Sequence, residues 1–86
     1  MERKYGNWVE GDERVARGTA DHAMGARVTF DKSGRPEWID VQYQSADGPG
    51  LQQLSIDFLN GMYLMQCLKA IQLDVGFALP DDPRLY

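Results

Sequence analysis

The chain has 86 residues, 43% hydrophobic and 26% charged, a composition that fits one folded domain and excludes a disordered chain. Nine Lys and Arg against thirteen Asp and Glu give a net charge of −4, which disfavours a protein that grips nucleic-acid phosphates. One cysteine and one histidine exclude an internal disulfide and a Cys/His zinc cage, so neither a metal nor a cofactor is expected.

The beginning of the sequence, MERKYGNW, has no apolar stretch of the kind that signal peptides carry. No run approaches the roughly 18 apolar residues that a membrane-spanning helix needs. Together with a single unpaired cysteine, this predicts a cytoplasmic protein that does not enter a membrane.

Residues 1–27 carry the weakest structural pattern. Turn-forming residues fill positions 10–13, and the stretch that follows, 14–20, alternates in the manner of a strand, between glycines that leave too little room for a helix. We therefore expect a strand over 14–20 and a connection over 21–25, with one or two N-terminal strands extending the sheet.

Residues 27–44 predict a β-hairpin with strands at about 27–31 and 36–44. The second strand alternates cleanly between apolar and polar side chains, so its two faces can be assigned. The inner face carries Ile39, Val41 and Tyr43, and the outer face carries Trp38, Asp40, Gln42 and Gln44.

Two turns fit the residues between these strands. A two-residue turn at 33–34 would place Val28 opposite Ile39 and would also place Arg27 opposite Asp40. A type I turn followed by a glycine bulge would shift the pairing by one residue and turn one strand over. We prefer the first register because it keeps the apolar residues of both strands on one face.

The stretch over 51–58 fits either a strand or the start of a long helix. As a strand, it places Leu54, Ile56 and Phe58 on one face with polar residues between them, a strict period of two. A helix running on from this stretch would have a mostly polar continuation of its main stripe. The sequence therefore predicts a strand, with Asn60 as the N-cap of the helix that follows.

Residues 60–76 form the only long helical pattern in the sequence, and Gly76 is suited to end it in the left-handed conformation. The main apolar stripe of this helix consists of Leu64, Cys67, Leu68 and Ile71. A second apolar side consists of Met62, Met65 and Leu73. A helix covered by one sheet needs a single apolar side, so the second one predicts a further contact.

These elements predict one α+β domain over 1–86: an antiparallel meander of three to five strands, followed by one C-terminal helix packed on one face. The tail after the helix carries Phe77, Leu79 and Leu85, which could cover the second side of the helix within one chain. A second chain could cover it instead, and we favour the second chain.

The residues suited to catalysis make no convincing set. His22, the only imidazole, falls in a predicted connection, and Cys67 falls on the core stripe of the helix without a basic neighbour. Asp40 and Asp57 share the outer face beside Trp38, as a pair of catalytic carboxylates could. An open sheet face does not desolvate an acid, however, so solvated carboxylates are the favoured interpretation.

The sequence thus favours a binding protein over an enzyme. We expect a cytoplasmic homodimer, or a complex with another protein, that uses an exposed binding set with no catalytic residue and no metal ligand. That set is Trp38, Asp40, Asp57, Met62, Met65 and Leu73. One alternative is a small enzyme whose carboxylate site forms between subunits, and another is an acidic, antitoxin-like inhibitor of a basic partner.

Overall fold

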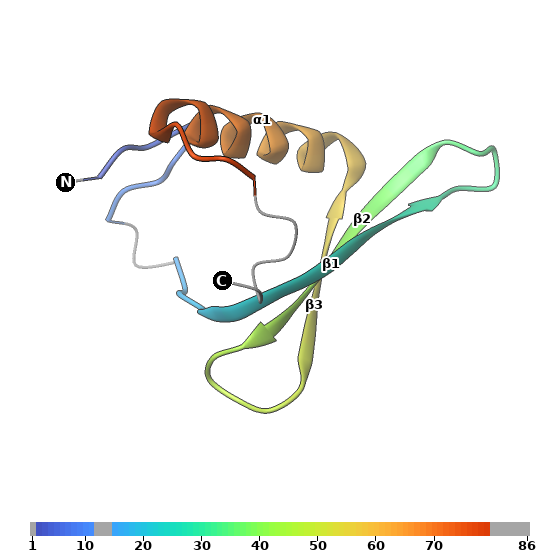
Figure 1. Ribbon diagram of the computed structural model, residues 1–86. Helices are drawn as coiled ribbons and strands as arrows, with labels where there is room; N and C mark the ends of the chain where they lie inside the picture. The colour runs from blue at the N-terminus through green and yellow to red at the C-terminus, as the bar shows by residue number, and fades with distance from the viewer. Residues whose placement is uncertain (1, 12–14, 80–86) are drawn as a thin grey trace.

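The structure, a computed structural model, describes residues 2–11 and 15–79. Three strands form an antiparallel sheet in the order β1-β2-β3, and one helix follows them (Figure 1). The elements are β1 (Ala20–Phe30), β2 (Pro36–Ser45), β3 (Leu51–Asp57) and α1 (Phe58–Val75). The predicted α+β fold, an antiparallel meander followed by a C-terminal helix on one face, is confirmed.

Strand β1 is longer than the sequence pattern indicated, because it begins at Ala20. The predicted connection over 21–25 is therefore wrong, since these residues belong to the strand. Two register shifts interrupt the pairing of β1 with β2 in this part, one of them just before Gly25. Each shift disrupts the alternation of faces, so a period-two search does not recognise the stretch as a strand.

The predicted strand over 14–20 does not form. Residues 15–19 join no sheet, and position 14 lies outside the described residues. Instead, the N-terminal segment lies along α1: the Tyr5 hydroxyl donates to Asp74 Oδ2 at 2.7 Å, and the Asn7 amide donates to the Tyr63 hydroxyl at 3.0 Å. Within the described ranges the sheet has three strands, without the predicted N-terminal extension.

The turn between β1 and β2 has three residues rather than the preferred two. The Asp31 amide donates to the Arg35 carbonyl at 2.9 Å, and the Gly34 amide donates to the Asp31 carbonyl at 3.0 Å. Gly34 has φ 87°, the left-handed conformation of a glycine bulge. The Asp31 carboxylate also accepts the amides of Ser33 and Arg35, which stabilises this wider turn.

The predicted register is nevertheless confirmed in the middle of the hairpin. Val28 lies opposite Ile39, and Arg27 lies opposite Asp40. A further register shift close to the turn compensates for the extra turn residue. The apolar face thus decided the central pairing, while the local turn chemistry decided the turn.

The junction between β3 and α1 is shorter than predicted. The strand ends at Asp57 and the helix begins at Phe58, so the prediction of Asn60 as N-cap is wrong. Asp57 is the N-cap, and its Oδ2 accepts the Asn60 amide at 3.3 Å. At the other end, Gly76 has φ 72° and donates its amide to the Gln72 carbonyl at 2.9 Å, the predicted helix stop.

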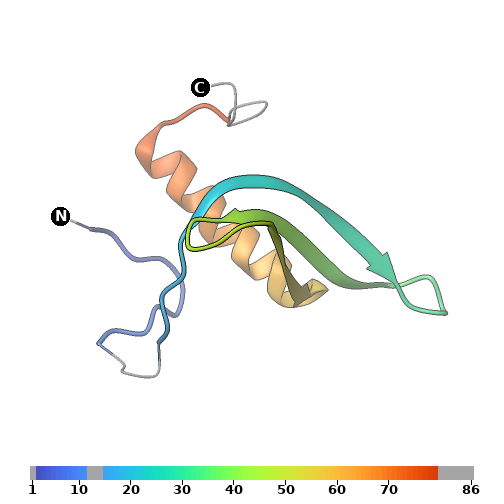
Figure 2. The ribbon, with the colours of Figure 1, turned by 90° about the horizontal axis from the view of Figure 1, so that it is seen from below.

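Helix α1 approaches the sheet closely at its first turns. Gly61 is buried there, and a Cβ atom at this position would lie 2.5 Å from Ile39 Cδ1 and 3.6 Å from Ile56 Cγ2. The missing side chain is what allows the two elements to approach. Beyond these turns the helix diverges from the sheet (Figure 1), and it crosses the sheet diagonally (Figure 2). Among the described residues, no helix combines the length and the apolar character that crossing a membrane requires.

Candidate functional site

Three polar side chains form a row across the outer face of the sheet, one from each strand. Arg27 of β1 donates its Nε–H to Asp40 Oδ2 at 2.6 Å, and Ser55 of β3 donates its hydroxyl to Asp40 Oδ1 at 2.6 Å. Asp40 is 7% exposed, and the register places the three residues directly side by side. The row links all three strands through one carboxylate.

The row holds Asp40 in its ionised form. The Ser55 hydroxyl, and after it the Arg27 guanidinium, lower the pKa of the Asp40 carboxyl below its usual value. Each carboxylate oxygen already accepts a hydrogen bond from a neighbouring strand. Such a group is a poor general acid at neutral pH, and the arrangement favours a structural tie between strands.

Acid titration should reveal this tie. Because the pKa of folded Asp40 is lowered, its contribution to stability is present above the unfolded pKa and is lost as pH falls through the folded pKa. Asp40→Asn should therefore lose stability at pH 7 and show a shallower acid decline between about pH 5 and pH 2. Urea unfolding across this range measures both effects, with the exposed loop variant Asp47→Asn as the control. Parallel acid declines for the wild type and Asp40→Asn would contradict the prediction.

Asp57, the second predicted carboxylate, is engaged separately. It caps α1, and hydrogen bonds from the Asn60 side chain and then from the Asn60 backbone amide lower the pKa of its carboxyl. In the register, Asp57 lies opposite Trp38 and Asp40 lies opposite Ser55, so the two carboxylates are diagonal neighbours on the outer face, as predicted. Each one serves its own partners, and they do not form an acid/base pair within one chain.

The remaining reactive side chains lie apart from this row. His22 is exposed on β1 opposite Gln44, in a strand rather than the expected connection. Cys67 is half-buried on α1 beside the N-terminal segment, where a Cβ on Gly6 would meet its sulfur at 2.8 Å. Within residues 2–11 and 15–79, no three His, Cys, Asp or Glu side chains gather as metal ligands.

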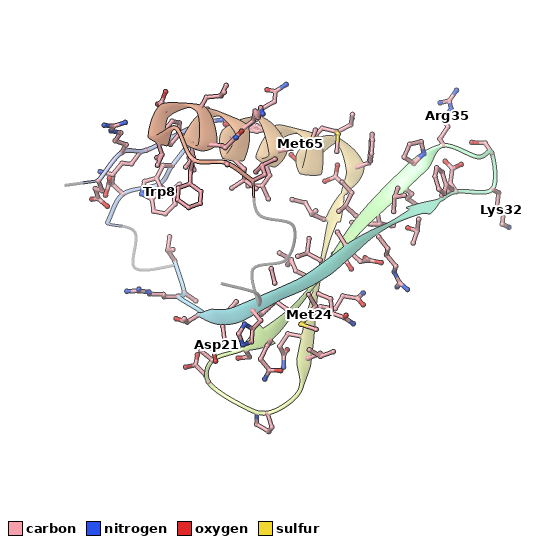
Figure 3. The ribbon with its side chains drawn as sticks, in the orientation of Figure 1. Trp8, Asp21, Met24, Lys32, Arg35 and Met65 are labelled. Carbon is pink, nitrogen blue, oxygen red and sulfur yellow. The ribbon has the colours of Figure 1, made fainter. Side chains whose placement is uncertain are left out.

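The more extensive candidate site is an apolar surface. No hydrophobic side chain in the described part of the chain is buried. Met65, which is labelled in Figure 3, lies on the second side of α1. On this side Met65 is 55% exposed, Leu73 is 66% exposed and Met62 is half-buried. The main stripe is hardly better covered, because Leu64 is 44% and Leu68 is 56% exposed. The expectation that the main stripe forms a core is therefore wrong, and both sides of the helix are open.

The C-terminal tail does not close this surface within the described residues. Phe77 folds back at the helix end, where its amide and carbonyl both hydrogen-bond to Gln72, at 3.3 and 2.9 Å. Its side chain remains 69% exposed, and that of Leu79 is 73% exposed. Leu85, the third predicted cover residue, lies outside the described residues. The helix side around Leu73 stays open beside this tail.

Trp38 borders a hollow between β3, α1 and the N-terminal segment. The hollow has a volume of about 590 Å³. Its aromatic and apolar lining includes Tyr5, Trp8, Trp38, Ile56, Tyr63 and Leu64. Trp8 approaches from the N-terminal segment, but Trp8 and Trp38 remain 65% and 43% exposed. Trp38 is thus flanked but not covered.

The sequence did not indicate that Tyr5 and Tyr63 anchor the N-terminal segment to the helix. Their hydrogen bonds join positions far apart in the chain, and no local pattern marks such contacts. The only available signal was aromatic content near the N-terminus.

Comparison of the chain with protein-family models, curated proteins and solved structures finds no match.

Proposed function

We propose that this protein is a small binding protein that acts as a homodimer through its exposed apolar surface. The observation that carries the proposal is that no hydrophobic side chain of the described residues is buried. A folded chain rarely exposes so many large hydrophobic side chains unless a partner covers them. The interface we propose includes Met62, Met65 and Leu73 of α1 together with the tail that follows.

The size of the exposed surface supports a dimer. The chain exposes 7606 Å², whereas a compact monomer of 9.7 kDa exposes roughly 5,100 Å². Its radius of gyration is 14.9 Å, against roughly 12 Å for a compact chain of this length. The surplus of about 2,500 Å² per chain, or about 5,000 Å² over two chains, lies at the upper end of the total area that permanent dimers bury, about 2,000–5,000 Å².

A second copy is the partner that the chemistry of this surface favours. The α1 side chains that form it are the half-buried Met62 and the exposed Met65 and Leu73, which are uncharged and pack against their own kind without electrostatic complementarity. A basic target would instead be recognised by clustered carboxylates, but Asp40 and Asp57 are occupied within the chain. Self-complementary patches of this sort form two-fold dimers.

Met65→Asp tests the proposal. A carboxylate placed at this 55% exposed position would have to lose its water in the dimer, so we expect about tenfold weaker association, or about 1.4 kcal/mol. Sedimentation equilibrium at micromolar concentrations measures it. Gln66→Asp is the matched control, since it adds the same charge at the next, natively polar position. A monomeric wild type, with Met65→Asp equally stable, would refute the homodimer.

A further inference from the structure

Strand β3 presents a regular edge, and the end of the strand near Asp57 borders the aromatic hollow. It pairs with β2 on one side, and on the other side no strand among the described residues pairs with it. The register between β2 and β3 runs without a shift over its whole length, from Trp38 opposite Asp57 to Gln44 opposite Leu51. The sequence LQQLSID contains no proline, lysine or arginine, the residues that commonly protect an edge strand.

The opposite margin of the sheet is different. Strand β1 pairs with β2 through three register shifts, two in its first half and one near the turn. Bulges bend and twist a strand, and natural sheets use them to discourage pairing at an edge. Of the two margins, β3 is therefore the one suited to accept another strand.

The geometry points to two copies of this chain joining through antiparallel β3 edges into one continuous six-stranded sheet. This inference rests on the proposed homodimer and adds the β3 edge to the α1 surface in its interface. Pairing the full length of β3 with its copy centres the two-fold axis on Leu54, which then lies opposite Leu54 of the partner subunit. Leu54 points to the same face as Ile56, the face that α1 covers, and is 54% exposed in the single chain.

The side chains of β3 agree with this register. An antiparallel pair about a two-fold axis keeps facing residues on the same side of the sheet, so both helices lie on one face. Leu51, which is 51% exposed on the outer face, would then lie opposite Asp57 of the partner subunit. Asp57 lies opposite Trp38 in the pairing of β2 with β3, so this contact would lie beside the aromatic hollow. The pairing thus covers apolar groups on both faces.

Disulfide trapping tests the register. In a Cys67→Ser background, Leu54→Cys places two thiols on the axis, at a Cα separation of about 4.5–5.5 Å, which a disulfide can span. Oxidised glutathione should convert most of this variant into a covalent dimer on a non-reducing gel. Gln53→Cys is the matched control, because its copies would be diagonal neighbours, at about 7–8 Å, and should cross-link at least tenfold less. Val28→Cys on β1 should not cross-link.

A charge substitution gives an independent readout. Leu54→Lys brings two like charges together at the axis, so we expect a monomer by light scattering, whereas Leu59→Lys, at a 78% exposed position outside β3, should remain a dimer. A dimeric Leu54→Cys variant that does not cross-link, or a Gln53→Cys variant that cross-links equally well, overturns the β3 pairing while the homodimer stands. A monomeric wild type overturns both.

Discussion

Gly61→Leu is expected to lower the free energy of unfolding by about 2 kcal/mol. Even a Cβ atom at this position would lie 2.5 Å from Ile39 Cδ1, so a leucine must displace Ile39 or lift α1 from the sheet. Overpacking of this kind costs about 1–3 kcal/mol, and the four added side-chain carbons place it near the upper end. The better helix propensity of leucine returns about 1 kcal/mol. Urea unfolding at one fixed protein concentration measures the net loss.

A double-mutant cycle identifies the cause. Ile39→Ala alone removes apolar contact, but combined with Gly61→Leu it makes room for the new side chain, so the double variant should be more stable than the two single losses predict. Gln66→Leu, which adds the same side chain at an exposed position of α1, should change stability by less than about 0.5 kcal/mol. Additive losses in the cycle would show that the contact between Gly61 and Ile39 does not hold α1 to the sheet.

Hundredfold dilution of the wild-type protein is expected to lower its apparent stability by about 2.7 kcal/mol per dimer. No hydrophobic side chain in the described ranges is buried, so little burial remains to stabilise a separated chain. Folding and association should therefore occur together, which makes the unfolding midpoint depend on concentration. Thermal unfolding followed by circular dichroism, from about 100 μM to 1 μM, measures the shift in Tm.

The dissociating variants provide the control for this dilution series. Leu54→Lys should be largely unfolded at every concentration of the series, because its chains no longer associate and a separated chain has little burial to stabilise it. A wild-type Tm that stays constant over the hundredfold range would contradict coupled folding. It would show that the single chain is stable with both helix sides exposed.

The hairpin shows how far local patterns reach. The alternation of Ile39, Val41 and Tyr43 was enough to predict the central register and the ion pair of Arg27 with Asp40. It was not enough to predict the turn, because the register shift between Thr29 and Phe30 offsets the extra turn residue. The extra turn residue and this register shift cancel each other in the central pairing, but the turn itself still has three residues. The alternation of apolar and polar residues therefore predicts which strand faces lie together, but it does not predict the length of the turn between the strands.

The junction at Asp57 shows a different limit. Asp57 and Asn60 are both good N-caps, and the sequence offers no means of choosing between them. The choice follows from packing, since starting the helix at Phe58 places Gly61 against Ile39. A single glycine in the first turns of a helix is an ambiguous local signal. In the tertiary structure, it marks the point of closest approach.

Local sequence patterns were enough to predict the fold class, the order and central register of the strands, the end of the helix at Gly76, and the excess of apolar side chains. These depend on periodicity and backbone preference, which are local properties. Tertiary packing brings α1 against the sheet near Gly61, places the N-terminal segment along the helix, and leaves both sides of α1 open. Coverage is a relation between segments distant in the chain, and the local pattern of a helix does not specify which segment covers it.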